Sequence, residues 1–260
     1  MNVLWVNAHP EPLSLTHQLA ADGIAALEAT GHEVRRSDLY RMGWNPVVTG
    51  DDFGHDPHDR LLVGKRSRRA LEDGTLAPDI REEQRKIDWA DGLVVQFPLW
   101  WFGMPAILKG WFDRILVEGY GYGVRRNTGE TGQGVGSTRR YGDGLLAGKR
   151  ATIVVSFGGS AHTVGPRGIN GRMDELLFPI QHGIFWYTGM SVVEPFLVDS
   201  ADRLTPDGYH DVAARLSEHV RDLFDCDPIA FYSQDTDYDE NFVLLRDRSP
   251  GATGVRAHSH

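Results

Sequence analysis

The chain has 260 residues, enough for one large α/β domain or two small ones with a substantial core. Its formal net charge of −9 argues against a nucleic-acid partner, which usually meets a basic stripe. The single cysteine, Cys226, excludes an internal disulfide framework, and no apolar run approaches the ~20 residues that span a bilayer. With no basic segment ahead of the first apolar run, we expect a soluble, cytoplasmic protein without a signal peptide.

Strands and helices alternate in the first third of the chain. Residues 2–7 are predicted to form a strand, and Ser14 is a suitable N-cap for a helix that runs to about Ala29. Gly31 ends that helix, and residues 32–37 form a more polar strand, which we place towards a sheet edge. Residues 40–64 show little periodicity, whereas residues 79–89 have a helical pattern.

The central stretch joins a buried strand to an aromatic loop. Leu93-Val94-Val95 is typical of a buried strand, which must stop at Pro98 because proline has no N–H for the ladder. Three aromatic residues follow at 100–102, and Pro105 precedes a helix over 106–116 with one apolar face. Aromatic side chains in such a loop can wall a flat, conjugated ligand. The alternative is a corner whose aromatic side chains only pack.

The second half continues the alternation. A Gly- and Arg-rich loop is predicted over 119–148, a buried strand over 151–155, and a helix over about 172–186. A strand at 191–198 and a helix at about 206–225 follow. The pattern predicts a doubly wound α/β domain at 1–225, with a parallel sheet covered by helices on both faces. Residues 226–260 lack periodicity and are expected to form an arm.

Two turns at strand ends are candidate ligand sites. The turn from Asn7 to Thr16 feeds a helix N-terminus, where free N–H groups and the helix dipole favour a phosphate. Ser14 could donate to that phosphate or could simply cap the helix, and His9 could donate a ring N–H. Gly158-Gly159 could let the backbone approach a flat ring or could form only a tight turn.

The string QFPLWWFGMPAILKGWFDR at 96–114 strongly resembles the NAD(P)H:quinone oxidoreductase family, the DT-diaphorases. Phe157-Gly158-Gly159, the Gly-Ile-Asn-Gly of 168–171, Pro179-Ile180-Gln181 and Glu194-Pro195 resemble that family in the same order. The resemblance implies a flavodoxin-like fold with strand order 2-1-3-4-5 and an arm at a homodimer interface. It also implies FAD, with NAD(P)H as co-substrate, and two-electron reduction of quinones by a ping-pong mechanism.

The resemblance also assigns site residues. In the family, the first turn binds the phosphate end of the flavin and the two later corners bind its ring. The positions that this implies for cofactor binding are His9, Ser14, Leu15, Thr16, Pro98, Leu99, Trp100, Trp101, Phe102, Ser156, Phe157, Gly158, Gly159 and Val164. The implied substrate-binding positions are Tyr122, Tyr187, Tyr238 and Phe242, the last two reaching the partner's site.

The chain departs from the better-known family members at catalytic positions. Val164 and Asn170 stand where those members have a tyrosine and a histidine that absorb charge on the reduced flavin, and Thr16 replaces an asparagine. We assign catalysis to Asn170, His162 and Tyr187. His162 or Arg167 could stabilise the charge that Val164 cannot; the alternative, which ordinary exposure preferences favour, is that both residues belong to a solvent-facing loop.

Several alternatives remain open. FMN could replace FAD, because flavodoxin-like folds often hold it. The same scaffold also serves azo- or nitro-compound reduction, and some bacterial relatives resemble regulatory subunits of potassium-efflux systems. His55 and His58 lie among aspartates, but their spacing fits no standard metal site, so we interpret this segment as solvated and expect no metal.

Overall fold

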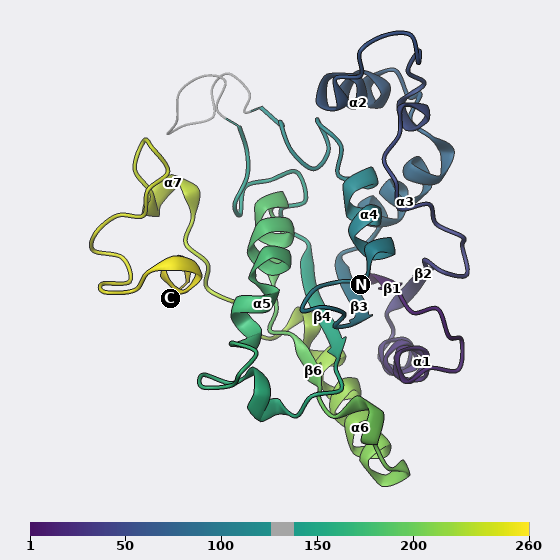
Figure 1. Ribbon diagram of the computed structural model, residues 1–260, viewed down its shortest axis with the longest axis vertical. Coiled ribbons are helices and arrows are strands. Elements are labelled where there is room, and N and C mark those ends of the chain that lie inside the picture. The colour runs from purple at the N-terminus through teal and green to yellow at the C-terminus, as the bar shows by residue number, and fades with distance from the viewer. Residues whose placement is uncertain (126–137, 260) are drawn as a thin grey trace.

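A five-stranded path of parallel strands forms the centre of the molecule (Figure 1). The structure, a computed structural model, describes residues 1–125 and 138–259, so part of the predicted 119–148 loop lies outside it. The strand order β2-β1-β3-β4-β5 confirms the predicted 2-1-3-4-5, and a sixth strand also pairs with β4. The strands are β1 (Asn2–Asn7), β2 (Glu33–Asp38), β3 (Gly92–Pro98), β4 (Arg150–Ser156), β5 (Ser191–Val192) and β6 (Phe196–Val198).

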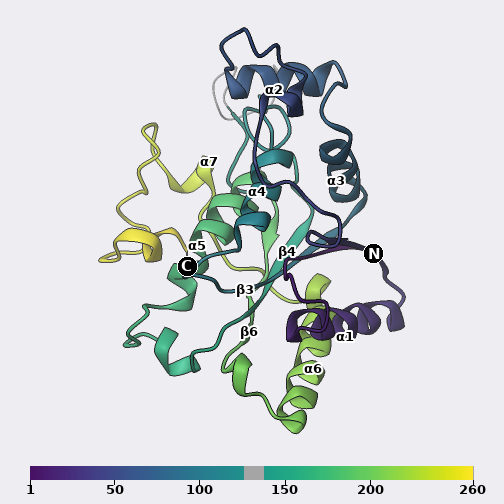
Figure 2. The ribbon, with the colours of Figure 1, turned by 45° about the vertical axis from the view of Figure 1, so that its right-hand side comes forward.

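Helices cover both faces of the sheet, because alternate strand residues point to opposite sides. On one side, Trp5 and Val94 pack with α1 (Leu15–Ala29) and α6 (Pro206–Arg221), which lie side by side in Figure 2. On the other side, Leu4 and Val95 pack with three helices. These are α3 (Pro78–Trp89), α4 (Ala106–Ile115) and α5 (Met173–Ile180).

Three predicted elements differ from those observed. The strand predicted over 191–198 is two short strands, because Pro195 has no N–H for the ladder with β4. The helix predicted over 172–186 is α5 followed by a π-helical stretch, Gln181–Trp186. Pro179 lies within α5 and cannot donate the bond that closes its own turn. The helix predicted over 206–225 ends as α6 at Arg221.

The first α-helix after β2 was not predicted from the sequence. Helix α2 (Val63–Glu72) buries only Ser67 and Ala70, so it has no apolar stripe to recognise. The remaining short elements are η1 (Gly50–Phe53), η2 (Ala161–Val164), η4 (Ala201–Arg203), η5 (Asp222–Phe224), α7 (Gln234–Asp237) and η6 (Gly254–His258). Within the described residues, no helix combines the length and apolar character needed to cross a membrane.

The C-terminal arm folds back onto α5. Arg256 lies 3.2 Å from the carboxylate of Glu175 on α5, and the His258 ring lies 6.1 Å from that of Phe178. The arm lies on the side of α5 away from the sheet in both ribbon views. It therefore adds a wall beside α5 without adding a strand to the sheet.

A buried amide ties the first helix to the sheet. Gln96 on β3 is 2% exposed; its Oε1 accepts from the Trp5 indole at 2.9 Å, and its Nε2 donates to the Thr16 carbonyl at 2.8 Å. Buried polar groups are costly unless they are paired, so this glutamine satisfies two neighbours at once. It thereby holds the first turn of α1 against the ends of β1 and β3.

Replacing Gln96 with leucine should lower the free energy of unfolding by about 2–4 kcal/mol, because the Trp5 N–H and the Thr16 carbonyl lose their partner. Urea unfolding measures the loss. A Trp5→Phe change removes the indole donor that the leucine variant leaves unpaired. The double variant should therefore lose less free energy of unfolding than the sum of the losses in the two single variants. Strict additivity would show that the amide does not couple the two elements.

Candidate functional site

The loops after β3 and β4 meet at one edge of the sheet. The two strands pair in parallel through Pro98 and Ser156, and the Leu99 N–H then donates to the Ser156 carbonyl at 2.8 Å. Parallel pairing places both carboxyl ends together, and open α/β sheets bind ligands at this edge. Two segments distant in the sequence thus form one corner.

The loop after β3 is a tight turn with strained aromatic residues. Trp100 and Gly103 exchange two backbone hydrogen bonds of 3.0 Å, and the residues between them have φ of 49° (Trp101) and 61° (Phe102). Non-glycine residues rarely adopt positive φ, and strain of this kind clusters at functional sites. Trp101 is 97% exposed and Phe102 is 49% exposed. The corner is therefore not a packed one, and its rings are available to a ligand.

The loop after β4 turns at two glycines that lie close to neighbouring side chains. A Cβ on Gly158 would lie 2.5 Å from Asp202 Oδ2, and one on Gly159 would lie 2.8 Å from Thr163 Oγ1. The Gly158 carbonyl accepts from Arg203 and the Gly159 carbonyl accepts from the Ser200 N–H. Within the described residues, the N–H groups of both glycines donate to no acceptor. Ser156 and Phe157 lead into this bare corner, with Phe157 only 8% exposed.

The turn after β1 borders a polar cavity. In the tautomer with its ring proton on Nε2, His9 Nδ1 accepts from the Glu11 N–H at 3.0 Å; the Glu11 carbonyl lies 3.3 Å from the same Nδ1. Burial lowers the pKa of His9, so the neutral ring presents an N–H donor at neutral pH. The cavity beside it, about 720 Å³, is lined on its polar side by His9, His17, Gln18, Arg36, Asp38, Tyr40 and Arg41.

The residues predicted to contact the phosphate differ in how exposed they are. Ser14 caps α1 by accepting from the His17 N–H, and Leu15 is the first helical residue. Thr16 is 3% exposed, so its hydroxyl is buried in the apoprotein. In the described residues, the N–H groups of Leu15 and Thr16 have no acceptor, as expected for a first helical turn.

The loop after the glycine pair carries the candidate catalytic residues. Val164 is buried, whereas His162 and Arg167 are exposed. The Asn170 N–H donates to the Thr163 carbonyl at 3.0 Å, which folds the loop back on itself. Ile169, which the sequence reasoning missed, is 92% exposed and is unusual for an apolar residue beside a candidate site. It could not have been found from the sequence, because nothing in the sequence shows whether a single apolar residue is exposed.

A second site lies between α5 and the C-terminal arm. Tyr238 and Phe242 line a cavity of about 290 Å³. Its other lining residues are Tyr141, Phe178, His182, Gln234 and His258. The Tyr238 hydroxyl and His258 Nδ1 are 2.8 Å apart, and burial raises the pKa of Tyr238 to about 12. We call this the aromatic cavity.

Tyr141 connects the remaining predicted tyrosines to the aromatic cavity. Its ring lies 5.1 Å from that of Tyr187, and Tyr187 in turn lies near Tyr122. The guanidinium of Arg140 stacks 4.4 Å from the Phe242 ring centroid and bonds Gln234 at 2.8 Å. The structure thus brings all four predicted substrate residues into one neighbourhood. The sequence reasoning missed Tyr141 because it lies in the Gly-rich loop.

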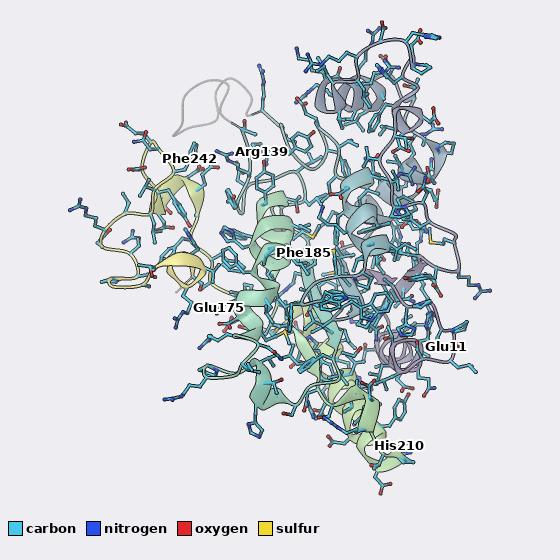
Figure 3. The ribbon with its side chains drawn as sticks, in the orientation of Figure 1. Glu11, Arg139, Glu175, Phe185, His210 and Phe242 are labelled. Atoms are coloured by element: carbon cyan, nitrogen blue, oxygen red, sulfur yellow. The ribbon has the colours of Figure 1, made fainter. Side chains whose placement is uncertain are left out.

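The two sites are separated. Helix α5 lies between the arm and the sheet (Figures 1 and 2), and Figure 3 shows Phe242 and Arg139 on the side opposite Glu11 of the first turn. One copy of the chain therefore carries the strand-end corner and the aromatic cavity as two separate sites.

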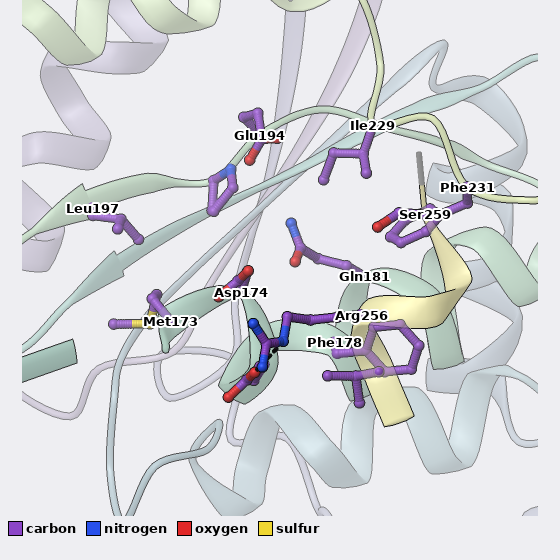
Figure 4. A pocket seen from close by; sticks show the side chains of 13 residues that line it. Met173, Asp174, Phe178, Gln181, Glu194, Leu197, Ile229, Phe231, Arg256 and Ser259 are labelled. Carbon is purple, nitrogen blue, oxygen red and sulfur yellow. Dashed lines mark ion pairs between the residues drawn. The ribbon is translucent and has the colours of Figure 1, made fainter. Parts of the chain in front are cut away.

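A third cavity, of about 310 Å³, lies between α5, β6 and the arm (Figure 4). Gln181 points into it, and its Nε2 has no hydrogen-bond partner among the described residues. Arg256 pairs with Glu175 at its rim, while Asp174 and Glu194 are exposed. No group of three His, Cys, Asp or Glu side chains in the described residues could hold a metal ion.

Comparisons with known proteins show which chains this one is similar to. A family model described as a flavodoxin-like fold matches residues 1–222. The ribosyldihydronicotinamide dehydrogenase-like protein traD of Penicillium crustosum is 38% identical over 100% of this chain and 96% of its own length. NAD(P)H dehydrogenase (quinone) 1 of Rattus norvegicus is 34% identical over 94% of this chain and 86% of its own. The solved structure of a candidate quinone reductase from Klebsiella pneumoniae is 41% identical, with a TM-score of 0.93 over 100% of both chains.

Replacing Trp101 with glycine should stabilise the ligand-free protein while weakening ligand binding at the turn. Glycine relieves the strain of the positive φ, and no buried contact is lost because Trp101 is 97% exposed. Glycine also gives the unfolded chain more conformational entropy, so the net gain in the free energy of unfolding is about 0.5–1 kcal/mol. Urea unfolding measures it. Phe102→Gly is the matched control, with a smaller gain because that ring is half-buried. A destabilised Trp101→Gly variant would show that the indole packs on the protein.

Replacing His182 with phenylalanine should remove part of the loss of folding stability at acid pH. The ring stacks on Phe178 at 4.5 Å, its Nε2 has no partner in the described residues, and burial with the nearby His258 lowers its pKa to about 4. The unfolded chain binds this proton near pH 6.5, so wild-type stability falls as pH drops from 6.5 towards 4.

Urea unfolding at pH 7 and pH 5 should show the His182→Phe variant gaining about 2 kcal/mol relative to wild type between the two values. Substitution of the exposed His58 is the control and should leave the wild-type pH slope unchanged. An identical slope in the His182→Phe variant would mean that the His182 ring is protonated equally in the folded and unfolded states.

Proposed function

This chain belongs to the flavodoxin-like family, and from that premise we propose that it is a flavin-dependent NAD(P)H:quinone oxidoreductase. The observation that carries the proposal is the corner at the sheet edge. There a strained, exposed aromatic turn meets a glycine pair with no side chains of its own. Full-length similarity to quinone reductases of 34–41% identity supports the same reaction class.

The corner fits a flavin ring. The aromatic turn offers apolar surface, and the N–H groups of Gly158 and Gly159 can donate to polar ring atoms because no side chain blocks their approach. When bound, the flavin supplies the redox chemistry, taking hydride from NAD(P)H and passing two electrons to a quinone. The chain's own residues would bind the flavin, orient it and shield it from water.

We propose FAD rather than FMN as the resident cofactor. The α1 N-terminus, with the free N–H groups of Leu15 and Thr16 and the Nε2–H of His9, suits phosphate oxygens. Beside this turn lies the cavity of about 720 Å³, which FMN, ending at its phosphate, would leave empty. The adenosine half of FAD would use such space.

Charge stabilisation at the flavin edge is assigned to the loop after the glycine pair. Asn170 can donate an amide N–H, and the exposed His162 can bring a positive charge when protonated. Buried Val164 can only pack. Tyr187, the third proposed catalytic residue, lies in the aromatic neighbourhood with Tyr141 and would position the substrate ring.

We propose a homodimer in which one copy's aromatic cavity faces the other copy's flavin corner. The support is the separation of the two half-sites within one chain, with α5 between them. In this arrangement residues 1–225 form the flavin-binding domain and the arm of 226–260 reaches the partner's site. We further propose a cytoplasmic location, which suits the unpaired Cys226.

Purified protein should be yellow, and the cofactor released from it should have the mass of FAD. With NADPH and menadione, steady-state kinetics should give the parallel double-reciprocal lines of a ping-pong mechanism, and sedimentation should show a dimer. Phe242→Ala should raise the KM for menadione several-fold with little change in bound flavin, because Phe242 lies in the aromatic cavity.

Other outcomes would select another function. A colourless preparation that stays empty with either flavin nucleotide would exclude the proposal. Bound flavin without turnover would favour a regulatory subunit. Faster reduction of an azo dye or a nitro compound than of any quinone would favour azo- or nitro-compound reduction on the same scaffold.

A further inference from the structure

His17 connects the helix cap at the first turn to the end of β2. Its Nδ1 is 3.0 Å from Ser14 Oγ, and its Nε2 is 2.9 Å from Asp38 Oδ2. The side chains of His17 and Asp38 are 11% and 13% exposed. The three residues form a continuous hydrogen-bonded relay, from the sheet edge to the hydroxyl that caps α1.

The carboxylate decides which nitrogen of His17 carries a proton. Burial raises the pKa of Asp38, but its hydrogen bonds with His17 and the Arg41 N–H, and the charges of His17 and Arg36, hold that pKa below its ordinary value. Asp38 is therefore ionised and accepts from Nε2–H. The Asn7 amide nitrogen lies 3.1 Å from the same Nε2, but a bond to a charged acceptor is the stronger one.

The direction of the Ser14 hydroxyl follows from this. In neutral His17 the proton is on Nε2, so Nδ1 is an acceptor and the Ser14 O–H must point at it. Ser14 Oγ also accepts from the His17 backbone N–H at 3.3 Å. In protonated His17, Nδ1–H donates to Ser14 instead. The hydroxyl proton is then free to turn towards an anion at the α1 N-terminus.

Charged groups of both signs face the His17 ring. Asp38 and Arg36 belong to β2, with Arg36 3.7 Å from the Asp38 carboxylate. Arg41 lines the same cavity, and His9 approaches edge-on with ring centroids 6.3 Å apart. Glu11 neighbours His9 in the turn. Arg36 and Arg41 oppose protonation of His17, and Asp38 favours it through direct contact; an added phosphate would favour it further.

We propose that His17 is a positioning residue of the flavin-phosphate site and takes up a proton when a flavin nucleotide binds. The inference rests on the proposed function. Protonation reverses the His17–Ser14 hydrogen bond, so Ser14 donates to the phosphate only in the protonated state. Because binding takes up a proton, affinity for FAD should fall as pH rises, by up to about tenfold per pH unit.

Isothermal titration of the full-length apoprotein with FAD, in two buffers of different ionisation enthalpy, measures the proton uptake. We expect uptake of up to one proton with FAD and none with riboflavin, which has no phosphate. FAD is preferred to FMN because a phosphate monoester itself titrates near pH 6. The variants His17→Gln and Ser14→Ala should both lose the uptake and bind FAD more weakly, with riboflavin affinity unchanged.

The outcomes separate the two proposals. His58→Gln, an exposed histidine outside the site, is the control and should keep wild-type uptake. FAD binding with the same proton uptake in His17→Gln as in wild type would overturn the role of His17 while leaving the proposed function intact. Failure of the wild type to bind any flavin would overturn both. Unfolding curves for each variant exclude global destabilisation as the cause.

Discussion

The parallel pairing of β1, β3 and β4 is the constraint on which the candidate site depends. Because the ladder is parallel, the turns after Asn7, Pro98 and Ser156 emerge at one edge, although the chain places them far apart. The buried amide of Gln96 holds these elements together further, because it forms hydrogen bonds with both β1 and the first turn of α1. Any ligand at this edge meets three backbone turns whose relative positions the sheet already sets.

Local strain and missing side chains give this edge its shape. Trp101 and Phe102 occupy positive φ, which costs on the order of 1–3 kcal/mol per residue and gains the apoprotein no packing at Trp101. Gly158 and Gly159 place no side chain over the N–H groups of the second corner. Strain that gains no packing is not expected of a fold optimised for stability alone, and it supports the planar ligand that we propose for this edge.

The aromatic cavity lies beside a buried histidine. Within the described residues, Nε2 of His182 has no hydrogen-bond partner, and the cavity is lined by side chains from α5, the loop near Tyr141 and the arm. Arg140 ties that loop to the arm through Gln234 and Phe242. Since α5 lies between this region and the sheet of its own chain, the dimer that we propose would use a second copy to bring the two sites together.

The sequence by itself determined the features that depend on neighbouring residues. The Ser14 cap, the strand end at Pro98, the aromatic run at 100–102 and the strand order all follow from local chemistry together with a family resemblance. Its hydrophobic pattern also predicted the buried faces of α3 and α4, whose apolar residues repeat at helical spacing.

Only the tertiary structure decided what depends on contacts between distant segments. It split the predicted 191–198 strand, revealed α2, whose charged surface has no apolar period, and set the positive φ of Trp101. It also joined His17 to Asp38 across 21 positions, where neither residue is unusual in its own segment. Periodicity reports which face of an element is buried, but hydrogen-bond direction and strain arise only when separate elements meet.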